Sequence, residues 1–284
     1  MSEIINLTLG HSPDPDDAFM HYALAKDKIE TGPYRFEHIL QDIQTLNERA
    51  TRGELDITAI SVHAYAYVSD KYALLPSGAS MGDRYGPMVV AKTAWEPKDL
   101  DGKRIAIPGL MTSAYLELKL ALAELGADFI PYVVPFDEIM QRVVAGEYDA
   151  GLIIHEGQLT YANLGLHSCL ELGIWWDELT GGLPLPLGAN TINKRHGAAM
   201  TDIARILENS IRYGLEHRDE ALAYALGWAR DMETDLADEF VGMYVNHWTL
   251  DYGEKGRASI RELLDRAFAA KLIPEVKDLE FIEV

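Results

Sequence analysis

Short apolar runs alternate with longer amphipathic runs through the first third of the chain. An apolar run at residues 4–10 is followed by a helix-like pattern at 16–29, and the same alternation continues to residue 92. Short apolar runs are typical of buried strands, whereas apolar positions three or four residues apart are typical of helices. This alternation predicts an α/β fold with a mostly parallel sheet.

The alternation starts again after Pro97. A strand is expected at 102–109, and a strongly periodic helix at 112–126 ends at a glycine, as helices often do. Residues 181–195 are rich in glycine and proline and are expected to form a loop, and the chain beyond them is expected to be helical. The pattern therefore indicates two α/β units followed by terminal helices.

One segment of the first unit matches a segment of the second. Residues 46–61 and 139–154, at a constant offset of 93, each contain a helix that ends at Gly-Glu-x-Asp and a short apolar strand after it. Such units are frequent in α/β proteins, so the match alone leaves chance similarity open. Because ligands bind beyond the carboxyl ends of strands in α/β sheets, matched units predict two lobes whose sites face one cleft.

The chain of 284 residues is strongly acidic, with 25 basic and 45 acidic residues and a net charge of −20. Such a surface repels nucleic acids and anionic membranes, so neither is an expected partner. It also repels small anions, so a carboxylate ligand would need local donors. The single cysteine, Cys169, excludes an intrachain disulfide, and the N-terminal residues lack the pattern of a secretory signal. We therefore expect a cytoplasmic protein.

Two expected helix starts carry hydroxyl groups where an anion would bind. Thr112 and Ser113 follow a strand and a glycine-containing loop, and Ser61 lies at the end of the strand at 56–61. The first turn of a helix presents unpaired N–H groups and the positive end of its dipole. A purely capping role for Thr112 is equally compatible with the sequence. Together the two starts predict a carboxylate site shared by the lobes.

His155 is the candidate for proton transfer, because it directly follows an apolar strand of the second unit. The ordinary pKa of histidine lies nearest neutrality among the side chains. The chain has nine histidines, so a structural histidine is the alternative. His63 could face the ligand, although a lone histidine near a helix start is more often structural. Glu156 could orient His155, although adjacent residues often point apart. No spacing in the sequence indicates a hydrolase triad or a zinc site.

An acidic segment lies between the first strand and the first helix. Asp14 is expected to cap that helix, with Pro15 at its first position and Asp16 and Asp17 in its first turn. Carboxylates at this place accept hydrogen bonds well, so Asp14 or Asp16 is a candidate to bind substrate hydroxyls. A magnesium site is conceivable, but the sequence offers no further acidic cluster at ligand spacing, and no metal is expected.

Several segments together resemble the 1,4-dihydroxy-6-naphthoate synthase family of the futalosine route to menaquinone. The resemblance covers nearly the whole chain and is weakest in the last helices. It is carried by HSPDPDDAFMHYAL at 11–24, DITAISVHAYAYV at 56–68, IPGLMTSAYLELKL at 107–120, GLIIHEGQLTY at 151–161 and GLPLPLGANTINKR at 182–195.

The resemblance implies a two-lobed fold like that of the type 2 periplasmic binding proteins. Residues 1–92 and 189–284 would form one lobe, and residues 93–188 the other. The activity that the resemblance implies is cleavage of cyclic dehypoxanthine futalosine to 1,4-dihydroxy-6-naphthoate without a metal or an organic cofactor. The family's proposed base falls on His155. Its substrate contacts fall on Ser61, Asn47, Ser113 and Ala114, with Thr112 beside them.

The chain departs from the family in its opening segment. Many members read Ser-Pro-Cys-Pro-Asn-Asp-Thr-Phe where this chain has Ser12-Pro13-Asp14-Pro15-Asp16-Asp17-Ala18-Phe19. The two additional acids place more negative charge near the expected cleft. Two other functions remain open on sequence grounds: a solute-binding protein for a small carboxylate without chemistry, and a chorismate dehydratase, which the His-Glu-Gly segment fits less well.

Overall fold

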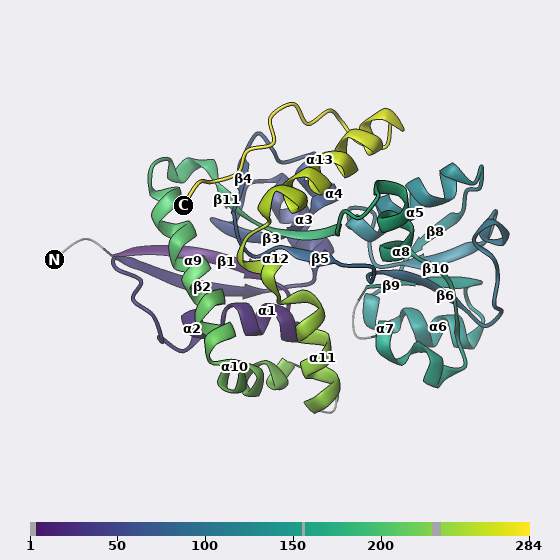
Figure 1. Ribbon diagram of the computed structural model, residues 1–284, viewed down its shortest axis with the longest axis horizontal. Coiled ribbons are helices and arrows are strands. Elements are labelled where there is room, and N and C mark those ends of the chain that lie inside the picture. The colour runs from purple at the N-terminus through teal and green to yellow at the C-terminus, as the bar shows by residue number, and fades with distance from the viewer. Residues whose placement is uncertain (1–3, 155–156, 229–233) are drawn as a thin grey trace.

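The computed structural model describes residues 4–154, 157–228 and 234–284, and the chain folds into two lobes, each built on its own sheet (Figure 1). The sheet of the first lobe is mixed. Its strands are β1 (Ile5–His11), β2 (Tyr34–Leu40), β3 (Ile57–Ser61), β4 (Tyr72–Leu74), β5 (Ser80–Gly82) and β11 (Leu185–Asn193). The order is β2-β1-β3-β11-β4, and β5 also pairs with β11. β1, β2 and β3 are parallel, whereas β11 is antiparallel to its three neighbours.

The sheet of the second lobe follows the same plan. Its strands are β6 (Met88–Ala91), β7 (Arg104–Ile107), β8 (Ile130–Val133), β9 (Ala150–Ile153) and β10 (His167–Glu171), in the order β10-β6-β9-β7-β8. β8, β7 and β9 are parallel, whereas β6 is antiparallel to β9 and β10. The expected α/β fold is confirmed, but only three strands in each lobe form the parallel arrangement that the sequence predicts.

The matched segments of the sequence occupy equivalent places in the two sheets. Residues 46–61 contain most of helix α3 (Ile43–Thr51) and β3, and residues 139–154 contain α6 (Ile139–Ala145) and β9. β3 lies between the parallel strand β1 and the antiparallel strand β11, and β9 lies between the parallel strand β7 and the antiparallel strand β6. The carboxyl ends of both strands lead into the region between the lobes.

The chain crosses between the lobes at places that differ from those expected. β6, expected in the first lobe, pairs in the second sheet, so the first crossing lies between Gly82 and Met88 rather than at residue 92. The return precedes β11 at Leu185 rather than residue 189. β11 also occupies a segment expected to be a loop. An apolar run does not reveal which sheet it joins, because both sheets offer a buried position.

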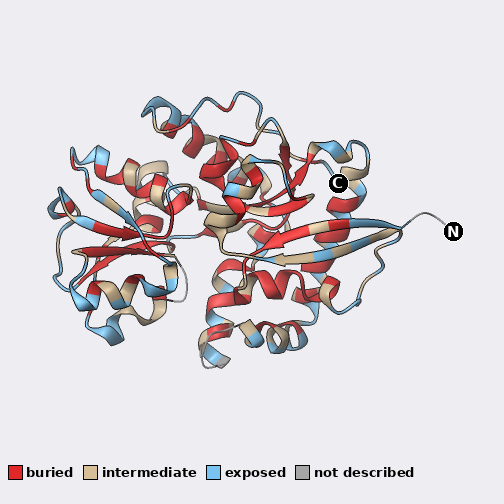
Figure 2. Cartoon of the chain, turned by 180° about the vertical axis from the view of Figure 1, so that it is seen from behind, coloured by how far each residue is buried: buried red, intermediate tan, exposed pale blue. Residues whose placement is uncertain are grey.

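Helices cover both sheets. In the first lobe they are α1 (Pro15–Met20), α2 (Tyr22–Ala25), α3 and α4 (Val62–Tyr65), and in the second α5 (Ser113–Glu124), α6, α7 (Gly157–Thr160) and α8 (Leu172–Thr180). Short 3-10 turns lie at Pro97–Leu100, Phe136–Glu138, Tyr161–Leu164, Lys194–His196 and Leu226–Trp228. Figure 2 shows that buried residues concentrate in the strands and on the helix faces toward them. One buried cluster includes Tyr65, Leu118, Trp176 and Leu263, so apolar packing is continuous between the lobes.

The terminal helices brace the first lobe and reach the region between the lobes. They are α9 (Ala199–Glu216), α10 (Arg218–Ala225), α11 (Thr234–Tyr244), α12 (His247–Leu250) and α13 (Gly253–Ala269). α9 packs on α2, α10 and α11 pack on α1, and α13 contacts β11 and α5. Beyond α13, Phe281 forms a β-bridge with Leu74. Within the described ranges, no helix has both the length and the apolar character needed to cross a bilayer.

Candidate active site

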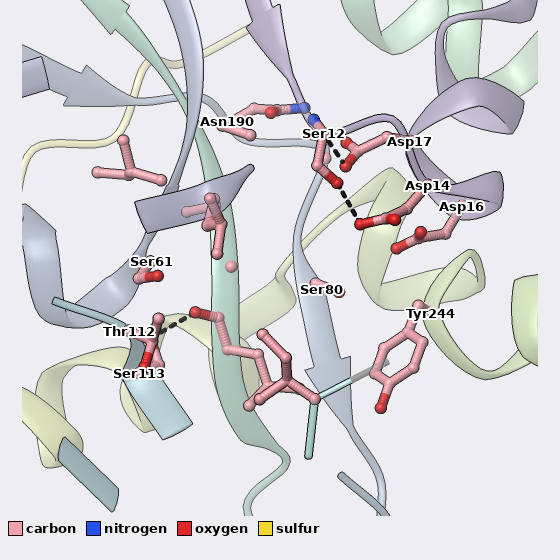
Figure 3. Close-up of a pocket in the computed structure, with 18 of the residues that line it drawn as sticks. Ser12, Asp14, Asp16, Asp17, Ser61, Ser80, Thr112, Ser113, Asn190 and Tyr244 are labelled. Atoms are coloured by element: carbon pink, nitrogen blue, oxygen red, sulfur yellow. Dashed lines mark hydrogen bonds between the residues drawn. The ribbon is translucent and has the colours of Figure 1, made fainter. Parts of the chain in front are cut away.

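A cavity between the lobes encloses about 760 Å³ of space, part of it open to solvent. The carboxyl ends of β1, β3 and β9 and the start of α5 all reach its wall, as expected for a ligand site in α/β sheets. Figure 3 shows Ser61, Thr112 and Ser113 on one side of the cavity and Asp14 and Asp16 on the opposite side. The lining therefore joins residues from both lobes that lie far apart in the sequence.

Ser61 is held at the cavity wall by the side chain of Asn47. The Asn47 Oδ1 atom accepts from the Ser61 backbone N–H at 2.8 Å, and Asn47 Nδ2 donates to Ser61 Oγ at 3.0 Å. Among the described residues, no acceptor takes the hydroxyl proton of Ser61, so this proton is available to a ligand. Asn47 is fully buried and does not line the cavity, so its contact with a substrate would run through Ser61.

Thr112 is the N-cap of α5, and its hydroxyl serves the helix. Its Oγ1 atom accepts from Tyr115 N–H at 3.3 Å and donates to the Gly109 carbonyl at 2.9 Å. The Ser113 hydroxyl donates to the carbonyl of Leu187. Because the first N–H groups of a helix have no intrahelical partner, the backbone amides of Ser113 and Ala114 remain as donors for an anion. An alanine with no polar side chain can therefore belong to a carboxylate site.

His63 ties the two lobes together. Its Nδ1 atom lies 3.1 Å from the Thr112 carbonyl oxygen, and its backbone N–H donates to Ser113 Oγ at 3.3 Å. Burial lowers the pKa of His63 to about 4, against the smaller opposing effect of the Thr112 hydrogen bond. A neutral ring at neutral pH donates from Nδ1 to that carbonyl. The ring is not part of the cavity lining, and its contacts join α4 of the first lobe to the start of α5 in the second.

A second set of contacts fixes the loop before α5 to α3. Gln44 Oε1 accepts from Met111 N–H at 3.0 Å, and Asn47 Nδ2 donates to the Met111 carbonyl at 3.3 Å. A Cβ atom at Gly109 would lie 2.2 Å from Gln44 Oε1, so a larger residue there would displace the Gln44 side chain from this contact. These contacts join the first lobe to the second behind Ser61 and Thr112, so this wall of the cavity forms with the two lobes in contact.

The acidic segment forms the opposite wall. Asp14 occupies the N-cap position of α1 and Pro15 the first helical position, as expected, but the Asp14 side chain makes no capping hydrogen bond. It accepts from the Ser12 hydroxyl instead, and Asp17 Oδ2 accepts from Ser12 N–H at 3.2 Å. The predicted position of Asp14 at the start of the helix is confirmed, but the predicted capping hydrogen bond is wrong, because the carboxylate bonds to Ser12 instead.

Burial and mutual repulsion change the protonation of this wall. Burial raises the pKa of Asp16 well above its usual range, and the nearby Asp17 and Asp14 raise it further. Burial raises the pKa of Asp17 to about 7, with Asp14 contributing in the same direction. Protonated carboxyl groups are therefore present near neutral pH. The wall can donate hydrogen bonds to substrate hydroxyls as well as accept them.

The chain matches the family described as "Menaquinone biosynthesis" over residues 7–269. It belongs to this family. A 1,4-dihydroxy-6-naphthoate synthase from Thermus thermophilus is 40% identical over 267 residues, which cover 94% of this chain and 95% of the relative. A protein from Archaeoglobus fulgidus with a known crystal structure is 45% identical, has a TM-score of 0.89, and is matched over 94% of this chain and 98% of that one.

A more distant structure identifies the fold of this family member. A Candida albicans protein, described as having the generic periplasmic binding protein fold, has a TM-score of 0.64 at 14% identity. The match covers 97% of this chain and 99% of that protein. At this identity the likeness shows the fold alone, and it confirms the two-lobed periplasmic-binding-protein-like architecture.

Two of the site residues that the sequence suggests, His155 and Glu156, lie outside the described residues. Ile154, which precedes them, lines the cavity immediately after β9. On the other side of the pair, Gln158 is buried in α7, and its Oε1 atom accepts from the Tyr244 hydroxyl at 3.0 Å. The segment that carries the family's proposed base is thus bounded on both sides by residues at or next to the cavity.

Sequence reasoning missed several residues of the cavity wall, among them two polar and two aromatic ones. Ser80 and Asn190 come from the segments around β5 and β11, and Phe240 and Tyr244 come from α11. The segment around Asn190 carries part of the family resemblance, so that signal was present but pointed to no particular residue. Nothing in the local pattern of α11 distinguishes its cavity-facing positions from ordinary core positions, because aromatic residues at helical spacing are typical of both.

Proposed function

We propose that the chain is a 1,4-dihydroxy-6-naphthoate synthase, a cytoplasmic lyase that converts cyclic dehypoxanthine futalosine into 1,4-dihydroxy-6-naphthoate. One observation carries the proposal. In a member of the menaquinone biosynthesis family, the cavity between the lobes has anion donors at one wall and carboxyl groups at the opposite wall. A polyol ring that bears a carboxylate has matching groups at its two ends.

The two walls suggest how the substrate lies. The carboxylate binds the hydroxyl of Ser61 and the first backbone amides of α5, at Ser113 and Ala114, where the helix dipole favours negative charge. These local donors offset the repulsion from a protein of net charge −20. The ring hydroxyls then face Asp14 and Asp16 on the opposite wall.

The proposed proton transfer falls to His155, which follows the cavity-lining Ile154 in the sequence. A neutral imidazole there removes a proton from the bound ring and starts the carbon–carbon cleavage that ends in an aromatic product. The proposal assigns no metal or organic cofactor to this step. If His155 is the base, kcat/KM falls in mildly acidic solution, because a protonated imidazole cannot accept a proton.

The test is to incubate the purified full chain with cyclic dehypoxanthine futalosine and to quantify 1,4-dihydroxy-6-naphthoate by chromatography and mass spectrometry. We expect steady product formation, and a loss of at least about 100-fold in kcat for His155→Ala, within the range for general bases. His167→Ala is the matched control, since the side chain of His167 is exposed on β10, away from the cavity lining. Full turnover by His155→Ala would refute the role of this residue.

The alternative functions give different results in the same assay. A solute-binding protein would retain the compound and release it unchanged. A chorismate dehydratase would act on chorismate and leave the cyclic futalosine intact. Either result, with a correctly folded protein, would refute the proposed synthase activity.

A further inference from the structure

A second, smaller cavity lies next to the acidic wall and shares Ser12 with the first cavity. Three histidines line it: His11 at the end of β1, His21 between α1 and α2, and His38 on β2. Their rings are in mutual contact, with centroid distances of 4.7 Å for His11 and His21 and 5.2 Å for His11 and His38. None of these histidines has a part in the proposed reaction.

The donor atoms of this cluster converge. One ligand atom each from His11, Asp17 and His21 lies within 4.8 Å of the other two. All three side chains are more than nine-tenths buried. A tetrahedral site with bonds of about 2.0–2.1 Å holds its donors about 3.4 Å apart, so small side-chain movements would bring these atoms onto one ion.

His21 supplies an independent sign of a ligand. It is 1% exposed, and neither ring nitrogen has a hydrogen-bond partner among the residues that the structure describes. Burying such a group without a partner costs about 1–3 kcal/mol, and buried side-chain polar atoms are nearly always paired. A bound ion would supply the partner that the buried ring lacks.

His11 is already in the form that binds a metal. Its Nδ1 atom lies 3.0 Å from the backbone oxygen of Ser12, to which it donates in the neutral ring. This bond leaves the lone pair on Nε2, which accepts from His38 Nδ1–H at 2.9 Å, and an ion bound at Nε2 would replace that hydrogen bond. A ligating histidine usually donates its other N–H to a carbonyl or carboxylate in this way, because the bond fixes its tautomer and orientation.

We propose that His11, Asp17 and His21 bind a divalent transition-metal ion such as Zn²⁺, with His38 completing a four-ligand site. Imidazole nitrogens with one carboxylate favour zinc, cobalt, nickel or copper, whereas magnesium and calcium prefer all-oxygen sites. The four proposed ligands are residues 11, 17, 21 and 38, and no short sequence motif marks this spacing as a metal site.

The position of the site gives it a structural role in the substrate cavity. Asp17 lines that cavity, and its Oδ2 atom accepts from Ser12 N–H at 3.2 Å. An ion bound to Asp17 and His11 would fix both ends of the segment that carries Asp14 and Asp16. The metal would thus order the acidic wall and take no part in the reaction itself.

The test uses the full chain without a histidine tag, treated with a chelator and dialysed. Titration with Zn²⁺ in a calorimeter is expected to give one ion per chain, and Zn²⁺ is expected to raise the Tm. Co²⁺ is expected to give the intense visible absorption of a tetrahedral ion. His21→Leu removes one ligand and also the unpartnered polar group, so it should remain folded and lose at least about tenfold in Zn²⁺ affinity.

His167→Ala, an exposed histidine on β10, is the matched control and should bind Zn²⁺ as the unmodified chain does. Asp17→Asn provides a second ligand variant, with the same expected loss of affinity, should His21→Leu fail to fold. The absence of saturable Zn²⁺ binding and of a tetrahedral Co²⁺ spectrum would overturn the proposal. Unchanged affinity in a folded ligand variant would overturn it as well. These readouts do not depend on the enzymatic activity.

Discussion

Asn47 holds Ser61 with both of its hydrogen-bonding groups, accepting from the Ser61 backbone at 2.8 Å and donating to its hydroxyl at 3.0 Å. The amide is buried behind the serine, on α3, while the serine faces the substrate cavity at the end of β3. Ser61 is therefore placed to contact a ligand, whereas Asn47 positions Ser61.

Asn47→Ala is expected to affect stability and substrate binding together. The substitution leaves the Ser61 N–H and the Met111 carbonyl without their partner, which costs about 1–3 kcal/mol of unfolding free energy. Without Asn47 the Ser61 hydroxyl is no longer held in place at the cavity, so we expect KM to rise. Chemical denaturation and steady-state kinetics measure the two effects, with Ser61→Ala as the comparison. Ser61→Ala should raise KM with a smaller loss of stability, and equal effects of the two variants on stability would contradict the assignment.

Thr112→Ala is expected to lower stability with little effect on KM. The hydroxyl caps α5 and donates to the Gly109 carbonyl, so its loss costs about 1 kcal/mol. The backbone amides of Ser113 and Ala114, which we assign to the carboxylate, are retained. Urea denaturation and KM values test this split, and Thr112→Ser, which keeps the cap, is the control. A large rise in KM for Thr112→Ala alone would show that the hydroxyl binds substrate.

His63 is expected to destabilise the fold in acid. Its pKa is lowered to about 4 by burial, while the unfolded chain has a value near 6.5. The unfolded state therefore binds more protons between these values, so stability is present above about pH 6.5 and is lost as the pH falls toward 4. The loss from this one group is on the order of 3 kcal/mol.

The measurement is the free energy of unfolding from pH 7 to pH 4 for the unmodified chain and for His63→Gln. We expect His63→Gln to have a lower free energy of unfolding at pH 7, because the hydrogen bond to the Thr112 carbonyl is altered. Glutamine does not titrate, so its free energy of unfolding should fall less between pH 7 and pH 4 than that of the unmodified chain. His167→Gln, at an exposed position, should keep the slope of the unmodified chain. Identical slopes for all three proteins would refute the role of His63.

Glu117 is expected to destabilise the fold in alkali. It is fully buried on α5, and neither carboxyl oxygen has a hydrogen-bond partner within the described part of the chain. Burial raises its pKa well above its ordinary value. The folded state therefore holds a proton that the unfolded state releases, and stability falls as the pH rises above about 4.3. Glu117→Gln cannot ionise, so its Tm should fall less between pH 5 and pH 9. Glu178→Gln, exposed on α8, is the control and should follow the unmodified chain.

The sequence by itself determined the local elements and the residues at their ends. The apolar periodicity placed most strands and helices, and the helix starts at Ser61 and Thr112 follow from residue types that favour such positions. The motifs quoted for the resemblance identified the family, and the offset repeat anticipated the equivalence of β3 and β9. These features depend on a few neighbouring residues, which is why a single sequence contains them.

Only the tertiary structure decided which distant segments meet. It assigned β6 and β11 to sheets, turned Asp14 toward Ser12 and brought Tyr244 to the cavity. It also packed His11 against His21 and His38, and placed Asp17 beside His11 and His21. The physical reason is that burial and long-range pairing set these contacts. An apolar strand fits either sheet, an aspartate at a helix start has more than one partner, and a histidine's neighbours depend on the packing of the whole lobe.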